Sequence, residues 1–327
     1  MADTAFSILD IVRRCNCVDD LDLLVNDEGM YRFVIDGKLV GAVSDKDAQQ
    51  LQMVSDEQAR PPFALDMERR LLTFSSWCDN RKKRTAAVAT VLEQLRASGA
   101  WASLAKWRSE LYMVYGSATD PDGVSLALER AASYNFGIRT FGVHINGITK
   151  SELGQVRMWV ARRSLQKQTW PGYLDQIAAG GIGDGMGVWE SVIKECNEEG
   201  GIPREIACRA KYAGVIQYFT RSDLGLQPET QFVFDLVLPD GFTPYPNDGE
   251  VDSFHLWTIE EVIDGIKQDK FKPNCAVCIV HFLVRHGYLT AENEPDYLDI
   301  VDNLYVRLPF PAPRFSIAAE RRGCDQP

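Results

Sequence analysis

The sequence lacks both a long uninterrupted apolar run and a surplus of positive charge. A membrane-spanning helix needs about 18 consecutive apolar residues, whereas apolar runs here, such as residues 232–234, are far shorter. The 327 residues include 35 Lys and Arg against 46 Asp and Glu, a formal net charge of -11. Because nucleic acids and anionic membranes attract positive surfaces, the composition disfavours both partners and favours small-molecule chemistry.

The start of the chain also lacks the features of a targeting segment. A secretory signal has a basic and then an apolar region, and a mitochondrial transit peptide is poor in acidic residues. The first twenty residues instead include Asp3, Asp10, Asp19 and Asp20. We therefore expect a cytoplasmic protein. We also expect it to be a monomer or a homodimer.

Cysteine and histidine form no pattern that indicates a metal site or a nucleophile. Cys15 and Cys17 have the wrong spacing for a zinc knuckle, and Cys275 and Cys278 lie in an apolar run that predicts a helix. We expect these thiols to be buried. No Ser/His/Asp or Cys/His arrangement stands out, and structural roles are expected for the four histidines, His144, His255, His281 and His286.

Turn signals divide the chain near residue 140. Ahead of this point the sequence predicts an amphipathic helix over residues 8–14, a hairpin that turns at Asp36-Gly37, and a helix over 85–97. The basic run at 81–84 is predicted to be the solvated start of that helix. Residues 1–140 are therefore expected to form a small α+β accessory domain.

Strand-like runs alternate with helix patterns after residue 140. The predicted strands cover residues 143–147, 156–161, 212–219 and 232–238, and the predicted helices cover 188–197, 259–268 and 275–285. This order predicts a mixed α/β domain over residues 141–290. The remaining segment, 291–327, is expected to be an irregular C-terminal extension.

The most informative segment is a glycine-rich loop that leads into a helix with clustered carboxylates, residues 179–202. Glu195, Glu198 and Glu199 stand at i, i+3 and i+4, so they share one helical face near the C-terminal end, where the helix dipole disfavours negative charge. Such a cluster is usually a solvated surface. The alternative is a bound cation, and oxygen ligands favour Mg²⁺ or Mn²⁺ over Zn²⁺.

The order of the parts favours the cation, because it resembles the Nudix box of the Nudix hydrolases. In that motif a glycine precedes a Glu, then an Arg-Glu pair, a Glu-Glu pair and a closing glycine. The matching residues here are Gly180, Lys194, Glu195, Glu198, Glu199 and Gly201. The resemblance implies that Mg²⁺, with Mn²⁺ as a substitute, is held by Glu195, Glu198, Glu199 and the backbone of Gly180.

Two positions depart from the Nudix box. Met186 stands in the place of the first Glu, and Lys194 replaces the Arg, which keeps the charge without the planar fork. Met186 also stands where a dinucleotide-binding fingerprint would need its third glycine, so that alternative fails.

Further segments look like the Nudix subfamily related to thiamine pyrophosphokinases, which carries an extra N-terminal domain of the DUF4743 type. These segments are residues 141–147, 159–164, 170–181, 248–254 and 271–274. The resemblance implies a Nudix α/β/α sandwich with a mixed sheet behind a small α+β domain. It also implies a pyrophosphatase that hydrolyses oxidised or damaged thiamine diphosphate to the monophosphate.

Candidate residues for the chemistry lie on and around the glutamate helix. The catalytic candidates are Glu198, Glu199 and Glu250, the last in a loop where the superfamily often recruits a further carboxylate as base or metal ligand. Cationic and aromatic candidates for substrate binding are Arg162, Arg163, Lys167 and Trp170. Tyr173, Tyr218 and Phe219 are weaker stacking candidates, since aromatic residues more often lie in a core.

Two other functions remain open from the sequence. The first keeps the enzyme but changes the substrate to a nucleoside diphosphate derivative, such as ADP-ribose or a dinucleotide. The second is a non-catalytic module that binds a ligand without turnover. The presence of all three glutamates disfavours the second.

Overall fold

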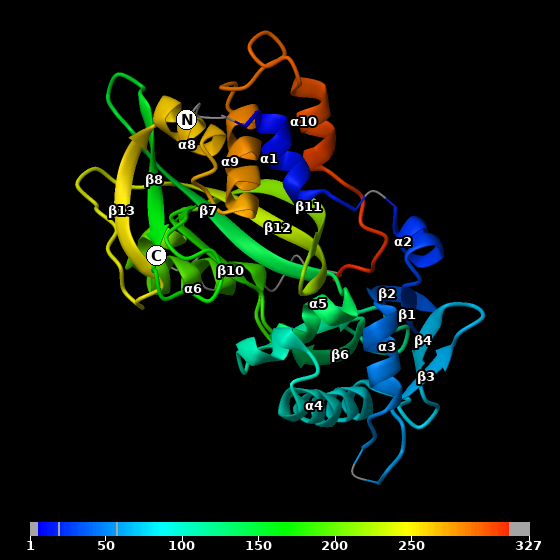
Figure 1. Ribbon diagram of the computed structural model, residues 1–327. Coiled ribbons are helices and arrows are strands. Elements are labelled where there is room, and N and C mark those ends of the chain that lie inside the picture. Colours follow the sequence, from blue (N-terminus) through cyan, green and yellow to red (C-terminus); the bar gives the residue numbers. More distant parts are fainter. Residues whose placement is uncertain (1–5, 19, 57, 314–327) are drawn as a thin grey trace.

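The computed structural model describes residues 6–18, 20–56 and 58–313. Within these residues the chain forms a four-stranded sheet, a two-stranded ribbon and a seven-stranded mixed sheet. Figure 1 shows the four-stranded sheet and the ribbon together at one end of the molecule, beside the larger sheet.

The small sheet has the strand order β2-β1-β4-β3. Its strands are β1 (Tyr31–Ile35), β2 (Lys38–Val43), β3 (Phe63–Asp66) and β4 (Leu71–Phe74). The predicted hairpin is confirmed, because Asp36 and Gly37 connect β1 to β2 with φ values of 49° and 74°, as a tight two-residue turn requires.

Helices and the ribbon complete this N-terminal unit. They are α3 (Asp45–Gln52), α4 (Arg81–Ser98), α5 (Ser133–Phe136), β5 (Leu111–Tyr115) and β6 (Val124–Glu129). Helix α4 begins four residues before the prediction because Asn80 caps it, accepting the backbone N–H of Lys83 at 3.0 Å. The basic run is only partly solvated, since Arg84 is buried and pairs with Asp36 at 2.6 Å.

The large sheet has the order β11-β12-β7-β8-β13, with β10 on β7 and β9 on β8. Its strands are β7 (Thr140–Lys150), β8 (Val156–Arg163), β9 (Leu174–Asp175), β10 (Ala178–Gly181), β11 (Lys211–Ser222), β12 (Gly225–Val237) and β13 (Val251–Thr258). Strand β7 pairs with β12 along one edge. On its other edge it pairs with β10 at residues 142–145 and with β8 only at 148–150, so the sheet forks between β10 and β8.

Helices cover both faces of the large sheet, which confirms the predicted α/β/α sandwich. The helices on one face are α6 (Val188–Gly200) and α7 (Arg204–Ala207). Those on the other face are α1 (Ile8–Cys15), α8 (Ile259–Lys267), α9 (Pro273–Arg285) and α10 (Tyr297–Leu304) (Figure 1). A further helix, α2 (Leu21–Asp27), packs on the β11–β12 end with Phe219 and Leu226.

Two segments and one thiol differ from the sequence-based expectation. Cys17 is exposed rather than buried. The predicted N-terminal helix forms as α1, but its apolar face packs against α9 in the core of the large sheet rather than within the N-terminal unit. The C-terminal segment is not wholly irregular, because α10 lies inside it and buries Ile300 and Leu304. Residues 314–327 lie outside the described part of the chain, and the division at residue 140 stays a prediction. Every described helix is too short or too polar to cross a membrane.

The buried histidine of α9 gives the fold a measurable pH dependence. Burial, reinforced by the Arg285 guanidinium, lowers the pKa of His281 from 6.5 to about 4. The unfolded chain therefore binds a proton below pH 6.5 that the folded chain does not take up until about pH 4. Relative to the His281→Gln variant, the unfolding free energy should fall by about 1.4 kcal/mol per pH unit across this window. Urea unfolding from pH 8 to 4 measures the difference, and a constant difference would contradict the assignment.

Candidate active site

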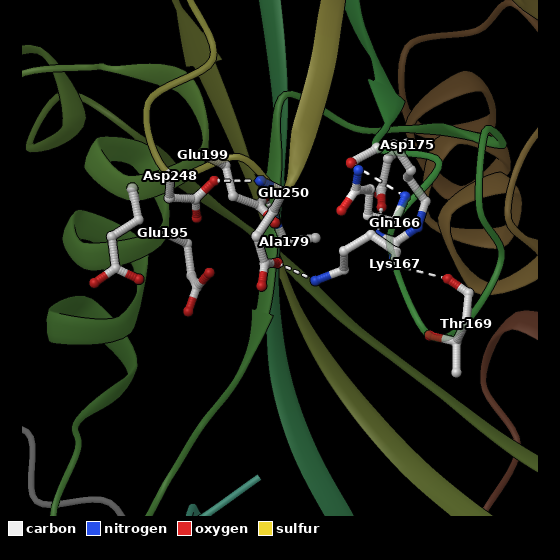
Figure 2. A network of polar contacts seen from close by, with 12 residues as sticks. Gln166, Lys167, Thr169, Asp175, Ala179, Glu195, Glu199, Asp248 and Glu250 are labelled. Atoms are coloured by element: carbon white, nitrogen blue, oxygen red, sulfur yellow. Dashed lines mark hydrogen bonds and ion pairs between the residues drawn. The ribbon is translucent and has the colours of Figure 1, made fainter. Parts of the chain in front are cut away.

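A cavity of about 680 Å³ lies where α6, the fork of the large sheet and the N-terminal unit meet. Its wall includes three of the α6 glutamates, Glu195, Glu198 and Glu199. Facing loops contribute Lys167, Asp248 and Glu250. Figure 2 shows Glu195 and Glu199 on one side of the strands, with Lys167 extending toward Glu250 from the other.

Helix α6 directs its carboxylates into this cavity because its opposite face is anchored in the core. Val188, Val192 and Cys196 are buried against the large sheet. The helix ends at Gly201, whose φ of 58° is the left-handed conformation that a helix stop commonly needs. Glu195 and Glu199 are only 8% and 5% exposed.

The backbone of β10 approaches the glutamates very closely. A Cβ atom at Gly180 would stand 2.1 Å from the carboxyl carbon of Glu195, so only glycine fits at this position. On the adjacent residue, the N–H of Ala179 donates to Glu199 Oε2 at 2.8 Å. The first glycine of the box therefore leaves the space that the Glu195 carboxylate occupies. We call this space the Gly180 seat.

The carboxylates crowd one another in a weakly solvated place. Burial raises the pKa of Glu195 and raises that of Glu199 well above its usual range, and the nearby Asp175 and Glu195 carboxylates raise Glu199 further. The main compensating cation is Lys194, whose Nζ lies 2.9 Å from Glu195 and 2.8 Å from Glu198. Although burial opposes it, hydrogen bonding to Glu198 and Glu195 raises the pKa of Lys194.

The donor set suits a hard divalent ion. Carboxylate oxygens are the ligands that Mg²⁺ prefers, and the Gly180 seat leaves no side chain between β10 and Glu195. Across the described residues no three His, Cys, Asp or Glu side chains already stand in ligating positions, and Lys194 bridges two of the glutamates. Lys194 is 45% exposed, so its side chain would have room to move toward solvent if a cation took its place.

A second acidic group stands in the loop before β13. The N–H of Glu250 donates to Asp248 Oδ1 at 2.8 Å, and the Glu250 carboxylate pairs with Lys167. Burial acts to raise the pKa of Glu250, but the hydrogen bond from Lys167 and its charge lower it overall. Glu250 is therefore an ionised carboxylate that faces the cavity.

The predicted substrate-binding residues separate into two groups. Arg163 and Lys167 line the cavity, and Arg163 is held by Asp175 Oδ2 at 2.7 Å. Arg162 and Trp170 do not line it: Arg162 donates to the Gly172 carbonyl, and Trp170 is 37% exposed with its ring against Tyr173. Tyr218 and Phe219 are buried core residues.

The structure adds cavity residues that the sequence did not single out. Lys272 lines the cavity, although residues 271–274 indicated only a helix start and a family resemblance. From the N-terminal unit come Arg108, Glu110, Tyr112 and Arg130, and from β12 come Glu229 and Gln231. No local sequence pattern marked the residues of these two groups, because long-range packing brings them to the cavity.

Strand β5 of the N-terminal unit is fastened to the loop between β10 and α6. The N–H of Asp184 donates to the Leu111 carbonyl at 2.7 Å, and the Asp184 carboxylate pairs with Arg81 at 3.0 Å. A Cβ at Gly181 would stand 1.9 Å from the Tyr112 hydroxyl. The N-terminal unit is thus in direct contact with the glycine loop of the box.

Comparison with known proteins agrees with this geometry. A model described as the NUDIX domain matches residues 141–277, and one described as a domain of unknown function (DUF4743) matches residues 7–140. Nudix hydrolase 20, chloroplastic, of Arabidopsis thaliana is 36% identical over 278 residues, which cover 83% of this chain and 72% of that protein. The chain belongs to the Nudix hydrolase family. It is therefore a pyrophosphohydrolase with a diphosphate substrate, in a family that generally uses a divalent metal.

Other similarities describe the extent of the match. The uncharacterized yeast protein YJR142W (Saccharomyces cerevisiae) is 36% identical over 325 residues, covering 94% of this chain and 92% of its own length. The solved C. elegans Ap4A hydrolase binary complex is 14% identical, with a TM-score of 0.35, and covers 46% of this chain and 99% of that one. Because the Arabidopsis relative is named chloroplastic, the cytoplasmic location of this Nudix hydrolase stays a prediction.

The Gly180 seat predicts a selective loss of activity. In Gly180→Ala the new methyl group should displace the Glu195 carboxylate and lower Mg²⁺-dependent diphosphate hydrolysis on the order of a hundred-fold. Gly183→Ala is the matched control, because its nearest neighbour would lie 3.4 Å away. Equal activities of the two variants would contradict the role of Gly180 in leaving space for the Glu195 carboxylate.

Because the Glu199 carboxylate is buried, we expect it to destabilise the metal-free protein. In EDTA at pH 8, Glu199→Gln should raise Tm by about 2–4 °C, because it removes a carboxylate that is costly to ionise. As the pH falls toward 5, wild-type Tm should approach that of the variant, since a raised folded-state pKa favours the protonated folded form. Differential scanning calorimetry tests this, with the exposed Glu205→Gln as control. A lower Tm for Glu199→Gln at pH 8 would contradict the account.

Proposed function

We propose that the protein is a Mg²⁺-dependent diphosphatase that cleaves oxidised or damaged thiamine diphosphate to the monophosphate. The observation that carries the proposal is the group formed by Glu195, Glu198 and Glu199 of α6, two of them buried, against the Gly180 backbone in the wall of a polar cavity. Support for the thiamine moiety comes from the resemblance of residues 141–147, 159–164 and 170–181 to the thiamine pyrophosphokinase-related subfamily.

The three glutamates and the backbone at Gly180 are the proposed metal ligands. When bound there, Mg²⁺ would supply positive charge to the diphosphate oxygens and make the attacking water more acidic. Lys194, which pairs with Glu195 and Glu198 in the metal-free structure, would release them and move toward solvent.

The cationic side chains of the cavity are proposed to bind the diphosphate. Lys167 faces the acidic wall, and Lys272 lines the same cavity. Arg163 has a further donor to offer, because its Nε is buried with no hydrogen-bond partner in the described part of the chain. Arg162 and Trp170 are left out of this proposal because their side chains lie outside the cavity.

Glu250 is the proposed proton acceptor. Its carboxylate is ionised and can accept a proton from the water that attacks phosphorus. Lys167, paired with it, would then hold both the base and the substrate in position. Glu198 and Glu199 would serve the reaction through the metal.

Two alternatives keep the same fold. The site can equally take a nucleoside diphosphate derivative such as ADP-ribose, since nothing in the α6 wall recognises the organic moiety. A binding module without turnover is disfavoured by the buried Glu199, which is costly to retain without a cation.

A substrate panel tests the function. With Mg²⁺, the wild-type protein should release thiamine monophosphate from oxidised thiamine diphosphate faster than it cleaves ADP-ribose or a dinucleotide. Glu198→Gln and Glu199→Gln should each lower this rate by orders of magnitude. Faster cleavage of ADP-ribose would show that a nucleoside diphosphate derivative, not a thiamine derivative, is the better substrate. Full activity of both variants would overturn the metal site. A rise in Tm with a diphosphate, without any turnover, would establish the binding module instead.

A further inference from the structure

The cavity extends beyond the glutamates of α6 to β12, where two polar side chains lie on neighbouring positions of one face. Glu229 and Gln231 pair in parallel register with Thr140 and Gly142 of β7, and all four residues line the cavity. Nothing in the proposed phosphate chemistry uses them.

The side-chain oxygen of Gln231 has no partner although the residue is only 5% exposed. Its Nε2 donates to the Tyr218 hydroxyl at 3.0 Å and to Glu229 Oε2 at 3.1 Å. An ionised carboxylate only accepts hydrogen bonds, so Glu229 fixes the amide nitrogen on its own side. The Gln231 carbonyl therefore points away from Glu229, toward Gly142, and buried acceptors of this kind normally have a donor.

No described cation forms an ion pair with Glu229, although the Lys272 ammonium lies within electrostatic reach of its carboxylate. The partners of Glu229 in the described part of the chain are the hydroxyls of Thr140 and Tyr218 and the Gln231 amide, all of them neutral. This part of the cavity consequently contains a carboxylate and a buried, unpartnered carbonyl, a combination that favours N–H donors.

Residues of the N-terminal unit lie beside Glu229, because Tyr112 and Arg130 line a smaller hollow together with it. Arg130 pairs with Glu110 at 2.8 Å and lies over the Tyr112 ring, with its Cζ 5.3 Å from the ring centroid. Tyr112 and Phe141 add apolar surface to this end of the cavity. An aromatic ligand with polar N–H groups matches such a surface.

We propose that Gln231 and Glu229, facing the Tyr112 side of the N-terminal unit, form a subsite for a nitrogen heterocycle that presents an N–H donor. The heterocycle is the organic part of the diphosphate substrate, so this inference rests on the proposed function. Gln231 Oε1 accepts the donor, and Glu229 holds the Gln231 amide in that orientation. The accessory domain thereby contributes to substrate choice.

Binding to Gln231 variants tests the subsite. In a Glu198→Gln background, which prevents turnover, calorimetry would compare thiamine diphosphate and ADP-ribose, which both carry an exocyclic amine, with methyl diphosphate, which has no ring. Adding Gln231→Leu should weaken the tighter of the two ring-bearing ligands at least ten-fold and leave methyl diphosphate unchanged. Gln217→Leu is the matched control, because Gln217 lies outside the cavity lining and bonds Arg139.

The outcomes separate the subsite from the proposed function. Equal weakening of all three ligands by Gln231→Leu, no weakening of any, or no binding of either ring-bearing ligand to the parent would overturn the subsite. Hydrolysis of methyl diphosphate with Mg²⁺ tests the phosphate chemistry separately. If Gln231→Leu preserves this hydrolysis and Glu198→Gln abolishes it, the proposed phosphate chemistry holds whether or not the subsite does. If Gln231→Leu does not fold, Gln231→Asn, which withdraws the same oxygen by one methylene, replaces it with the same expectation.

Discussion

The repulsion among the buried carboxylates of α6 is the interaction on which the site depends. Glu195 and Glu199 are almost fully buried, and Glu198 lies next to Glu199 and one turn from Glu195. The helix therefore concentrates negative charge where water screens it poorly. The fold accepts this cost because the apolar face of α6 is anchored in the core and Gly180 leaves room for the Glu195 carboxylate. Lys194 relieves part of the repulsion. A protein that only needed stability would neutralise such a group, so the crowded carboxylates support the proposed cation site.

The second constraint is the fork in the large sheet. Because β7 pairs with β10 along its first half and with β8 only at its end, side chains from both faces of the sheet reach one cavity. The glutamates come from the α6 face, whereas Gln231 and Lys272 come from the α9 side. The N-terminal unit closes this arrangement, since β5 is bonded to the loop that leads into α6. The acid wall and the ring-binding residues are thus supplied by different layers.

Local sequence patterns predicted much of the fold and the chemical centre of the site. The hairpin at Asp36-Gly37, the glutamate face of α6 and the α/β/α layers follow from turn chemistry, helical periodicity and a motif with fixed spacing. Patterns could not place α1, whose apolar face is equally suited to either core, nor predict α10 in a segment with scattered prolines. Sequence patterns also could not predict that Arg108, Arg130 and Gln231 line the cavity, because tertiary packing alone decides those positions. Arg162 shows the converse: its charge was visible, but alternation along β8 turns it away from the cavity that Arg163 lines.

The central claim is that the α6 glutamates hold a divalent cation against Gly180. A crystal structure of the protein soaked in Mn²⁺, with anomalous data collected at the manganese edge, tests it most directly. We expect an anomalous peak in contact with at least two of Glu195, Glu198 and Glu199, with the Lys194 side chain moved out toward solvent. A saturated crystal in which Lys194 still bridges Glu195 and Glu198, with manganese absent or bound elsewhere, would contradict it.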